Sequence, residues 1–533
     1  MKAKLPLLLA LMTLLSLASN SLLAQSESNE LPVLTIYTDW ESDQEGAIHL
    51  SLSGSESDFS TTYIDAGYGK KKPTDVDQDG AIPAKGNVIK VYGRFEGIGT
   101  PMDITKKIEI APNDFIKEVN ISLTTLEEQP DLSKCQALTR LTMMACELKS
   151  IDFDKIPASI TTLQVLVNDL SEIVLPSMPN LDELSAGSCP NMSKVDVSGA
   201  PNLTRLDIGS SPMLTTLDLS KNPNLIYLAA YDCALSNIDL SHCNSLENIS
   251  LSGNKLSQLK LGNTEAIEIL ELANNRLTAI DLAKMPKLKS LSLRANTQVS
   301  SIDLSNNPEL MILTADSTAI KEIKVNHLKN LETLDLGTTQ LTKLDISGMP
   351  ALQNVSIEHC YSVSEINFAN APLLTNILID GNKLSFDQTA QMAKDLPEAD
   401  IQMGPFIGVY SQGDPKEGNL MHEEAVELCR SKNYAVMQRD SEGEVSDYNG
   451  IPASIDPLTA PKLSYRDTGA QIVIDLSAIN KIVSTAYLYS MSGELIRSYE
   501  LSGGSLEINK KELRQGTHYL IHIEGIGSLI LHL

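Results

Sequence analysis

The sequence is poor in aromatic residues and in positive charge. Phenylalanine, tryptophan and tyrosine make up 4% of its 533 residues, with one tryptophan, Trp40. The 42 lysines and arginines are outnumbered by 68 aspartates and glutamates, which gives a net charge of −26. A surface of this sign repels nucleic acid and anionic lipid, so the sequence predicts neither as a partner. The scarcity of aromatic rings also disfavours a glycan-binding protein, which remains an alternative.

Recognisable catalytic motifs are also missing. The eight histidines include no H-E-x-x-H pair, and the chain has neither a G-x-S-x-G elbow nor a phosphate-binding P-loop. His422 stands beside Glu423 and Glu424, which suit the first turn of a helix, because carboxylates favour the positive end of the helix dipole. The sequence therefore predicts a protein that is not an enzyme and that uses no cofactor.

Long apolar runs are absent beyond the first 24 residues. Residues 1–24, MKAKLPLLLALMTLLSLASNSLLA, combine two lysines, a leucine-rich core and small residues before Gln25, which is typical of a secretory signal peptide. No cysteine follows the core, which argues against a lipoprotein; an uncleaved anchor is the alternative. No later segment reaches the roughly 18 apolar residues of a membrane span. We therefore expect no transmembrane segment in the mature chain.

The middle of the chain contains a repeat of 21 to 22 residues. Its units follow L-x-x-L-x-L-x-x-N-x-L and then x-x-L-D-L-S-x-x-P-x, as in LENISLSGNKLSQLKLGNTEA from Leu246. One unit cannot bury its own leucines, so neighbouring units must stack and share a core. The pattern predicts a leucine-rich repeat solenoid over residues 116–398, with short extended segments on its back. The clearest units begin at Leu138, Ile160, Leu181, Leu203, Leu225, Leu246, Ile267, Leu288, Leu310, Leu331, Leu352 and Leu374.

The ninth position of the unit is expected to point into the coil and to hydrogen-bond backbone groups at a turn. Asparagine can donate and accept there, while serine, threonine and cysteine do so more weakly. Cys135 and Cys243 share a different repeat position, so only Cys429 lies outside the pattern. We therefore expect no disulfide framework and no cysteine metal site. The ninth residues are Cys146, Asn168, Cys189, Ser211, Cys233, Asn254, Asn275, Asn296, Thr318, Thr339, Cys360 and Asn382.

The second half of each unit repeats the same leucine spacing, as in LTTLDLS and LSNIDLS. This nested pattern resembles bacterial leucine-rich repeats of the internalin-like and Bacteroidetes surface-protein type. The resemblance implies a role in adhesion, host interaction or biofilm formation.

The C-terminal residues 456–533 alternate apolar and polar side chains between glycine-containing turns, which predicts a second β domain. The segments YLYSMSGELI (487–496) and RQGTHYLIHI (514–523) resemble motifs of the type IX secretion sorting domain of Bacteroidetes, a β-sandwich. Gln515 replaces the proline of that family, and no basic residue ends the chain at Leu533. The resemblance implies export by the type IX secretion machinery of a Gram-negative bacterium, followed by release or attachment to the cell surface.

The two regions that flank the repeats have different predicted roles. Residues 25–115 contain short segments rich in β-branched residues, which predict an N-terminal β-sandwich cap. This cap resembles the module that precedes such repeats in related surface proteins, with Asp65 opening a D-x-G-x-G turn. Residues 399–455 are expected to form a C-terminal cap and linker, with helices predicted over 386–398 and 422–431.

One segment has the opening of a calcium loop. Asp75, Asp77 and Asp79 precede Gly80 at the spacing of an EF-hand, where carboxylates bind Ca²⁺. However, Gly86 stands where the bidentate glutamate would be, and no helices are predicted on either side. A solvated acidic turn is favoured, and a structural Ca²⁺ site is the alternative.

The front strands of the predicted solenoid offer a binding surface. Most outward residues are small and polar, but six residues over four to five coils gather the aromatic, aliphatic and charged groups that are typical of protein-binding hot spots. A smaller group contains Glu358, His359 and Tyr361. The six predicted ligand-binding residues are Tyr227, Tyr231, Ile269, Glu271, Arg294 and Ile312.

The sequence thus favours a secreted or surface-attached protein that binds a protein ligand on host or neighbouring bacterial surfaces. The main alternative is a structural spacer of a surface layer or matrix, whose solenoid has no specific ligand.

Overall fold

The structure is a computed structural model that describes residues 31–532 apart from 74–80, 412–413, 415, 441, 452–464, 476–484, 491–494, 502–504, 514–517 and 524–526. The predicted signal peptide and the calcium-loop residues Asp75, Asp77 and Asp79 lie outside the described residues. The chain divides into two compact units, and the division falls within the repeats: the first unit runs to Lys255 and includes Leu259–Asn263, and the second holds the remainder.

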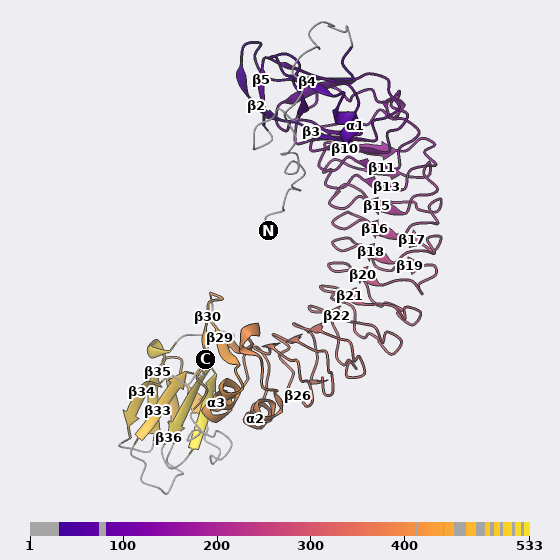
Figure 1. Cartoon of the computed structure of the whole chain (residues 1–533). Helices are drawn as coiled ribbons and strands as arrows, with labels where there is room; N and C mark the ends of the chain where they lie inside the picture. Colours follow the sequence, from indigo (N-terminus) through magenta and orange to yellow (C-terminus); the bar gives the residue numbers. More distant parts are fainter. Residues whose placement is uncertain are drawn as a thin grey trace. The chain divides into compact units, whose positions relative to one another are not determined.

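The first unit begins with short antiparallel strands (Figure 1). Four of them form a sheet in the order β4-β6-β1-β8, and β2 pairs with β5. Alternate residues of the central strands, such as Leu34, Ile36 and Val91, are fully buried, as the alternation of apolar residues predicts. The elements are β1 (Leu34–Thr38), β2 (Glu45–His49), β3 (Ser51–Ser53), α1 (Glu56–Phe59), β4 (Tyr63–Asp65), β5 (Ala81–Lys85), β6 (Val88–Tyr92), β7 (Gly97–Gly99) and β8 (Thr105–Ile110).

The predicted turn at Asp65 is present. Its Oδ1 atom accepts hydrogen bonds from the backbone N–H groups of Gly67 and Gly69, at 3.0 and 3.1 Å. Both glycines have positive φ angles, 95° and 82°, which a side chain would strain.

The repeats of the first unit form a parallel sheet with one short strand per coil (Figure 1). The register advances by one repeat at each step, so that Leu141 lies beside Leu163 and Leu163 beside Leu184, all of them buried. The front strands are β9 (Glu118–Ser122), β10 (Arg140–Met144), β11 (Thr162–Gln164), β13 (Glu183–Ser185), β15 (Arg205–Asp207), β16 (Tyr227–Ala229) and β18 (Asn248–Ser250).

The second unit continues the same pattern, and the chain is a mainly β leucine-rich repeat solenoid of about 13 turns. Leu270, Leu291, Leu313 and Leu334 are paired in register and fully buried. Its front strands are β20 (Ile269–Glu271), β21 (Ser290–Ser292), β22 (Ile312–Thr314), β23 (Thr333–Asp335), β25 (Asn354–Ser356), β27 (Asn376–Leu378), β28 (Phe406–Ser411) and β29 (Ala435–Arg439).

The backs of the coils are short and extended, as predicted. Parallel pairs form between β12 and β14 and between β17 and β19 in the first unit, and between β24 and β26 in the second. These elements are η2 (Phe153–Lys155), β12 (Glu172–Val174), β14 (Lys194–Asp196), β17 (Asp239–Leu240), β19 (Lys260–Leu261), β24 (Lys343–Asp345) and β26 (Glu365–Asn367).

The parallel sheet extends beyond the residues that carry the repeat motif. In the first unit, β7 pairs in parallel with β9, although it precedes the expected start at residue 116. In the second unit, β28 and β29 add two parallel strands within 399–455, where only a cap and linker were expected. The reason is that each coil still supplies a strand there, while the helices α2 (Phe386–Asp395) and α3 (Glu423–Ser431) replace the extended back. Both helices lie where they were predicted.

An antiparallel strand closes the sheet at the outer end of each unit. β3 pairs with β7 in the first unit, and β30 (Val445–Asp447) pairs with β29 in the second. An antiparallel partner satisfies part of an exposed sheet edge, which would otherwise template further strand addition.

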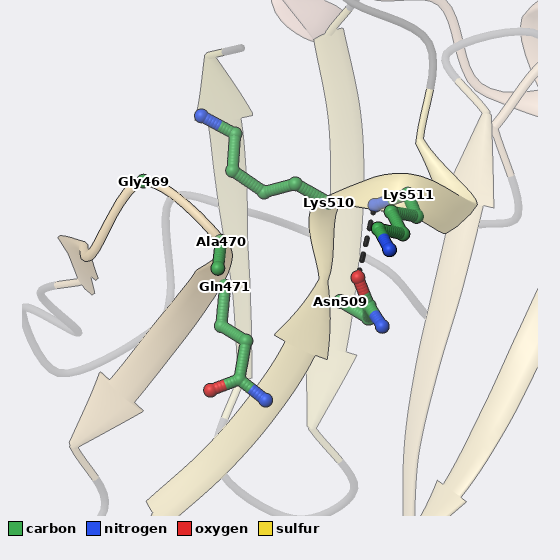
Figure 2. Close-up of a pocket in the computed structure, with 6 residues that line it drawn as sticks. All are labelled: Gly469, Ala470, Gln471, Asn509, Lys510 and Lys511. Atoms are coloured by element: carbon green, nitrogen blue, oxygen red, sulfur yellow. Dashed lines mark hydrogen bonds between the residues drawn. The ribbon is translucent and has the colours of Figure 1, made fainter.

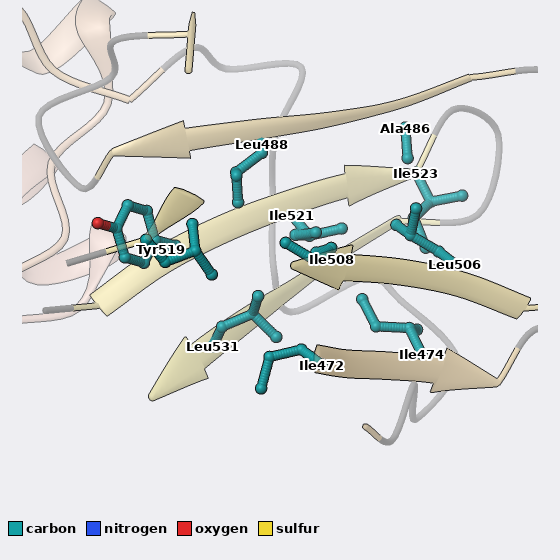
Figure 3. Close-up of a cluster of buried hydrophobic side chains, with 11 residues drawn as sticks. Ile472, Ile474, Ala486, Leu488, Leu506, Ile508, Tyr519, Ile521, Ile523 and Leu531 are labelled. Atoms are coloured by element: carbon teal, nitrogen blue, oxygen red, sulfur yellow. The ribbon is translucent and has the colours of Figure 1, made fainter. Parts of the chain in front are cut away.

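The C-terminal residues form two antiparallel sheets. The sheets have the orders β31-β32-β35 and β34-β33-β36-β37. Side chains of both sheets share one buried cluster, in which Ile472 and Ile508 of the first meet Leu488 and Ile521 of the second (Figure 3). The remaining elements of the unit are η3 (Ile401–Met403), β31 (Tyr465–Asp467), β32 (Gln471–Asp475), β33 (Thr485–Ser490), β34 (Leu495–Glu500), β35 (Ser505–Asn509), η4 (Lys510–Glu512), β36 (His518–Ile523) and β37 (Gly527–His532).

Within the described residues, none of the helices has the length and hydrophobicity that crossing a membrane requires.

Candidate ligand-binding face

The inner ladder holds the front strands in a fixed register. In Asn254 the Oδ1 atom accepts from the backbone N–H of Leu235 at 3.0 Å, and the Nδ2 atom donates to the carbonyls of Ala230 and Leu251 at 2.8 and 2.9 Å. Asn254 therefore joins two coils, and its inward direction and its hydrogen bonds to the backbone are as predicted for the ninth position. Serine ties the coils together less well than asparagine at this position. The buried hydroxyl of Ser211 has no hydrogen-bond partner among the described residues. The rigid ladder means that outward side chains stand on a preformed surface.

A second row of inward amides was not predicted from the sequence. Asn222 donates to the carbonyls of Val197 and Ala200 at 3.0 and 2.8 Å. In the second unit Asn307 occupies the same position of its repeat and donates to the carbonyls of Leu282 and Met285 at 3.1 and 2.9 Å. Cys135 and Cys243 share this position, and both are buried. Their common spacing was the signal that could have identified the row.

Two aromatic side chains of the first unit face outward on one coil, as predicted. Tyr227 opens β16 and is half-buried, and Arg205 lies directly beside it on β15. The guanidinium carbon of Arg205 is 4.2 Å from the centroid of the Tyr227 ring, a cation–π contact that fixes both side chains.

Tyr231 follows on the same coil and covers a glycine of the preceding one. A β-carbon at Gly209 would lie only 2.4 Å from the Tyr231 ring, so the ring rests directly on the backbone there. Asp207 accepts a hydrogen bond from the N–H of Gly209 at 3.1 Å and holds that backbone in place. We call Arg205, Tyr227 and Tyr231 the tyrosine patch. Arg205 was not among the predicted binding residues.

The other four predicted residues belong to the second unit. Ile269 and Ile312 are 37% and 42% exposed, and Ser290 lies between them in the sheet. Glu271 is exposed at the other end of β20. Arg294 follows β21 and forms an ion pair with Asp316 at 3.1 Å. We call Ile269, Glu271, Arg294 and Ile312 the isoleucine patch. The six predicted residues thus form two groups, one in each unit.

Burial raises the pKa of the Asp316 carboxyl, and the neighbouring Asp335 raises it further, while Arg294 lowers it. Asp316 was not predicted as a site residue, because its ion-pair partner, Arg294, lies one repeat earlier in the chain.

Near the end of the repeats in the second unit, the small group predicted around Glu358 gains partners from the residues that follow the repeats. Glu358 forms an ion pair with Arg439 of β29 at 3.2 Å. The rings of His359 and Tyr361 stack at 5.8 Å, and the His359 Nδ1 atom lies 3.7 Å from Asp414. Burial, together with Asp414, raises the pKa of the Tyr361 hydroxyl to about 12.

The aspartates on the back of the coils have a structural explanation. Their Oδ1 atoms accept from the backbone N–H two residues later, as at Asp196, Asp281 and Asp303, at 3.0 Å in each case. Lys260 forms an ion pair with Asp239, which relieves the repulsion along this row.

The described residues contain no group of three or more His, Cys, Asp or Glu side chains that could hold a metal ion. All seven cysteines are buried and unpaired. Burial raises the pKa of Cys135 to about 11 and that of Cys146 to about 12, so these thiols are poor nucleophiles.

One hollow of about 610 Å³ lies in the C-terminal sheets (Figure 2). The turn between β31 and β32 meets the end of β35 and η4 there, and Lys510 is engaged by Asp467 at 2.7 Å. A nucleophile, base and oxyanion donor do not converge among its lining residues, as catalysis would require. The lining residues are Gly469, Ala470, Gln471, Asn509, Lys510 and Lys511.

Comparisons with known proteins agree with this architecture. A family model described as Leucine Rich repeats (2 copies) matches residues 265–307. The functional domain of InlJ from Listeria monocytogenes, which includes a cysteine ladder, is similar with a TM-score of 0.50 and 19% identity, over 75% of this chain and 87% of that one. No curated protein matches the sequence.

Two further solved structures are similar at lower scores. A leucine-rich repeat protein from Leptospira interrogans has a TM-score of 0.44 and 20% identity, over 54% of this chain and 84% of that one. YopM from Yersinia enterocolitica has a TM-score of 0.43 and 22% identity, over 54% and 59%. The family match and the likeness to InlJ support a leucine-rich repeat solenoid of the internalin-like type.

Proposed function

We propose that this chain is a secreted or surface-attached recognition protein that binds a protein ligand through the front face of its repeats and carries out no catalysis. The observation that carries the proposal is the tyrosine patch. Tyr227 and Tyr231 place two aromatic rings on the front of one coil, and Arg205 and Gly209 hold these rings in place. Rigid aromatic and guanidinium groups dominate binding energy at protein interfaces.

The placement outside the cell is part of the same proposal. The signal-peptide pattern of residues 1–24 supports secretion. The C-terminal residues 456–533 are proposed to be a β-sandwich sorting domain that directs type IX secretion, which the shared core of their two sheets supports. The N-terminal strands are proposed to be a β-sandwich cap.

Replacement of both Tyr227 and Tyr231 by alanine tests the recognition proposal. Neither residue is a core leucine, so the solenoid should remain folded. Capture of the double variant on host cells and co-resident bacteria should weaken by more than about 2 kcal/mol. Tyr68→Ala provides a control, since this exposed tyrosine lies in the turn that follows β4, away from the repeats. If the double variant adheres like the wild type, the spacer alternative is favoured.

A further inference from the structure

The N-terminal strands carry a group of lysines that was not among the predicted binding residues. Lys70, Lys71 and Lys72 follow one another in a chain whose net charge is −26. Lys71 is tied to β4, because its backbone N–H and carbonyl each form a 2.8 Å hydrogen bond with the backbone of Ile64. β4 is the first strand of its sheet, so these lysines extend the edge of that sheet with a fixed backbone.

The outer face of this sheet is the face on which the lysines gather. Ile64 of β4 and Val91 of β6 are buried in the core. Side chains alternate along a strand, so their neighbours Tyr63, Lys90 and Tyr92 point to the opposite, outer face. Tyr63 and Tyr92 are direct partners in the pairing of β4 with β6, which places their rings next to each other.

These two tyrosine rings hold lysine side chains in place. The Nζ atom of Lys70 lies 3.9 Å from the centroid of the Tyr92 ring, and that of Lys72 lies 4.2 Å from the centroid of Tyr63. Lys72 also donates a hydrogen bond to the carbonyl of Ser60. The face of an aromatic ring attracts an ammonium group but does not cancel its charge, as a carboxylate would. The contacts therefore fix two positive charges without neutralising them.

A third lysine adds to the same face. Lys70 and Lys90 are both exposed, and neither forms an ion pair with any described residue. Lys90 is two residues from Tyr92 along β6, a separation of about 7 Å. Asp65 lies opposite Lys90 on β4, but its Oδ1 atom already accepts the N–H groups of Gly67 and Gly69. We define the lysine patch as Lys70, Lys72 and Lys90.

The patch is confined to the half of the sheet that β4 and β6 form. At the other edge, on β8, Lys107 forms ion pairs with Glu109 and Glu128, both at 3.1 Å. The positive charge of that edge is therefore balanced within the protein. Only the lysine patch offers ammonium groups to a ligand on the described part of this face.

A narrow anionic chain suits this surface better than a broad anionic one. Charges are screened beyond about 8 Å at physiological ionic strength, so acidic residues elsewhere have little effect on a thin chain that lies on the patch. A nucleic-acid duplex or a membrane would face a wide area of an acidic protein and would be repelled. A peptide would need apolar or aromatic anchors, and both rings of the patch lie beneath ammonium groups.

We propose that the lysine patch binds an acidic polysaccharide, whose carboxylates meet the ammonium groups of Lys70, Lys72 and Lys90. Each ammonium has three N–H donors, and charge-assisted hydrogen bonds to carboxylates are stronger than neutral ones. Because a polysaccharide repeats its carboxylates, it can engage several lysines at once, which strengthens binding without deep burial. This site is separate from the tyrosine patch and would add a glycan contact to a chain whose repeats are proposed to bind protein.

A charge-matched pair of variants tests the proposal. The probe is fluorescent polygalacturonate, neutral dextran is its control, and binding to the full chain is followed by fluorescence anisotropy. Lys70→Gln combined with Lys90→Gln should weaken binding at least about fivefold, because each surface charge contributes modestly to a multivalent contact. Lys221→Gln combined with Lys287→Gln removes the same charge from two exposed lysines of the repeats and should change binding less than about twofold. Equal losses in the two pairs, or no binding by the wild type, would overturn the proposal.

A conservative pair separates charge from structure. Lys70→Arg combined with Lys90→Arg keeps both charges and should bind polygalacturonate within about twofold of the wild type. A loss as large as that of the glutamine pair, at an unchanged melting temperature, would show that the patch does not act through its charge and would overturn the proposal.

Duplex DNA and vesicles that contain phosphatidylserine are the competing probes. Tighter binding of either than of polygalacturonate, lost in the Lys70→Gln and Lys90→Gln variant, would assign the patch to that ligand and overturn the proposal. The Tyr227→Ala and Tyr231→Ala double variant should bind polygalacturonate like the wild type. A failure of the tyrosine patch can therefore be told from a failure of the lysine patch.

Discussion

Asn275 ties its own coil to the preceding one through the backbone of Leu256. Its Oδ1 atom accepts a hydrogen bond from the Leu256 N–H at 3.0 Å, and its Nδ2 atom donates to the carbonyl of Leu272 at 3.0 Å. Both ends of the amide are buried, so water cannot replace either bond. The amide therefore acts as a cross-link between coils.

Replacement of Asn275 by leucine should cost about 1–3 kcal/mol of unfolding free energy, because buried backbone groups lose their partners. Chemical denaturation of the full chain provides the measurement. Asn330→Leu is the control, since this asparagine is exposed and donates only to the carbonyl of Pro308. Equal stability of the Asn275 variant and the wild type would contradict the register described here.

The residue before each ladder position has a left-handed backbone, which gives a stabilising substitution. Val167 has a φ angle of 58° and is 51% exposed, so its branched side chain adds strain and little packing. The left-handed region costs an L-residue about 1–2 kcal/mol, whereas glycine loses about 0.5–1 kcal/mol of chain entropy. Val167→Gly should therefore raise stability by several tenths of a kcal/mol to about 1 kcal/mol. Thermal melting should show this increase, while Val174→Gly in β12 should lower the melting temperature.

The buried Glu417 predicts a pH dependence. Its carboxylate accepts from the N–H groups of Gly381, Ser411 and Asn419 at 2.7 to 2.9 Å. Burial outweighs these bonds and raises its pKa from 4.5 to about 8. Between these values the folded protein holds a proton that the unfolded chain has lost, so this contribution to stability is present below pH 4.5 and is lost as the pH rises to about 8.

Unfolding measurements at pH 5, 7 and 9 on the wild type and on Glu417→Gln test this. The difference in stability between the two proteins should shift against the wild type as the pH rises. A difference that does not change with pH would show that Glu417 is ionised throughout this window. The back-row aspartates do not interfere, because their lowered pKa values act only in more acidic solution.

The proposed role of the C-terminal residues in export can be tested by a truncation. Removal of residues 461–533 should trap the protein in the periplasm of its own host, because the type IX machinery would lack its signal. Surface labelling and cell fractionation provide the measurement. Normal amounts of the truncated protein at the cell surface would rule the assignment out.

The solenoid could be predicted from the sequence because the residues that form it recur at a regular spacing along the chain. The leucines at Leu141, Leu163 and Leu184 recur at one spacing, and stacking them buries all three. The inward direction of the Asn254 amide follows from the same register. The outward direction of Tyr227 and Tyr231 could be predicted for the same reason.

Side-chain contacts between neighbouring coils could not be predicted from this spacing. The ion pair of Arg294 with Asp316 joins residues one repeat apart. The ion pair of Glu358 with Arg439 joins a repeat to a later strand, and the connections between them do not have the length of a repeat. Whether Asp380 is exposed or buried depends on the cap that follows it. Its 2% exposure is set by residues far along the chain.

The sequence by itself determined the solenoid, the position of its ladder and the face that its coils present, because each repeat imposes the same local geometry. Only the tertiary structure decided which side chains meet on that face. Side chains of neighbouring coils reach one another over a few ångströms of strand spacing, whereas they are about 20 residues apart in the chain. The cation–π contact of Arg205 with Tyr227 and the ion pair of Arg294 with Asp316 arise from that stacking, which no local pattern records.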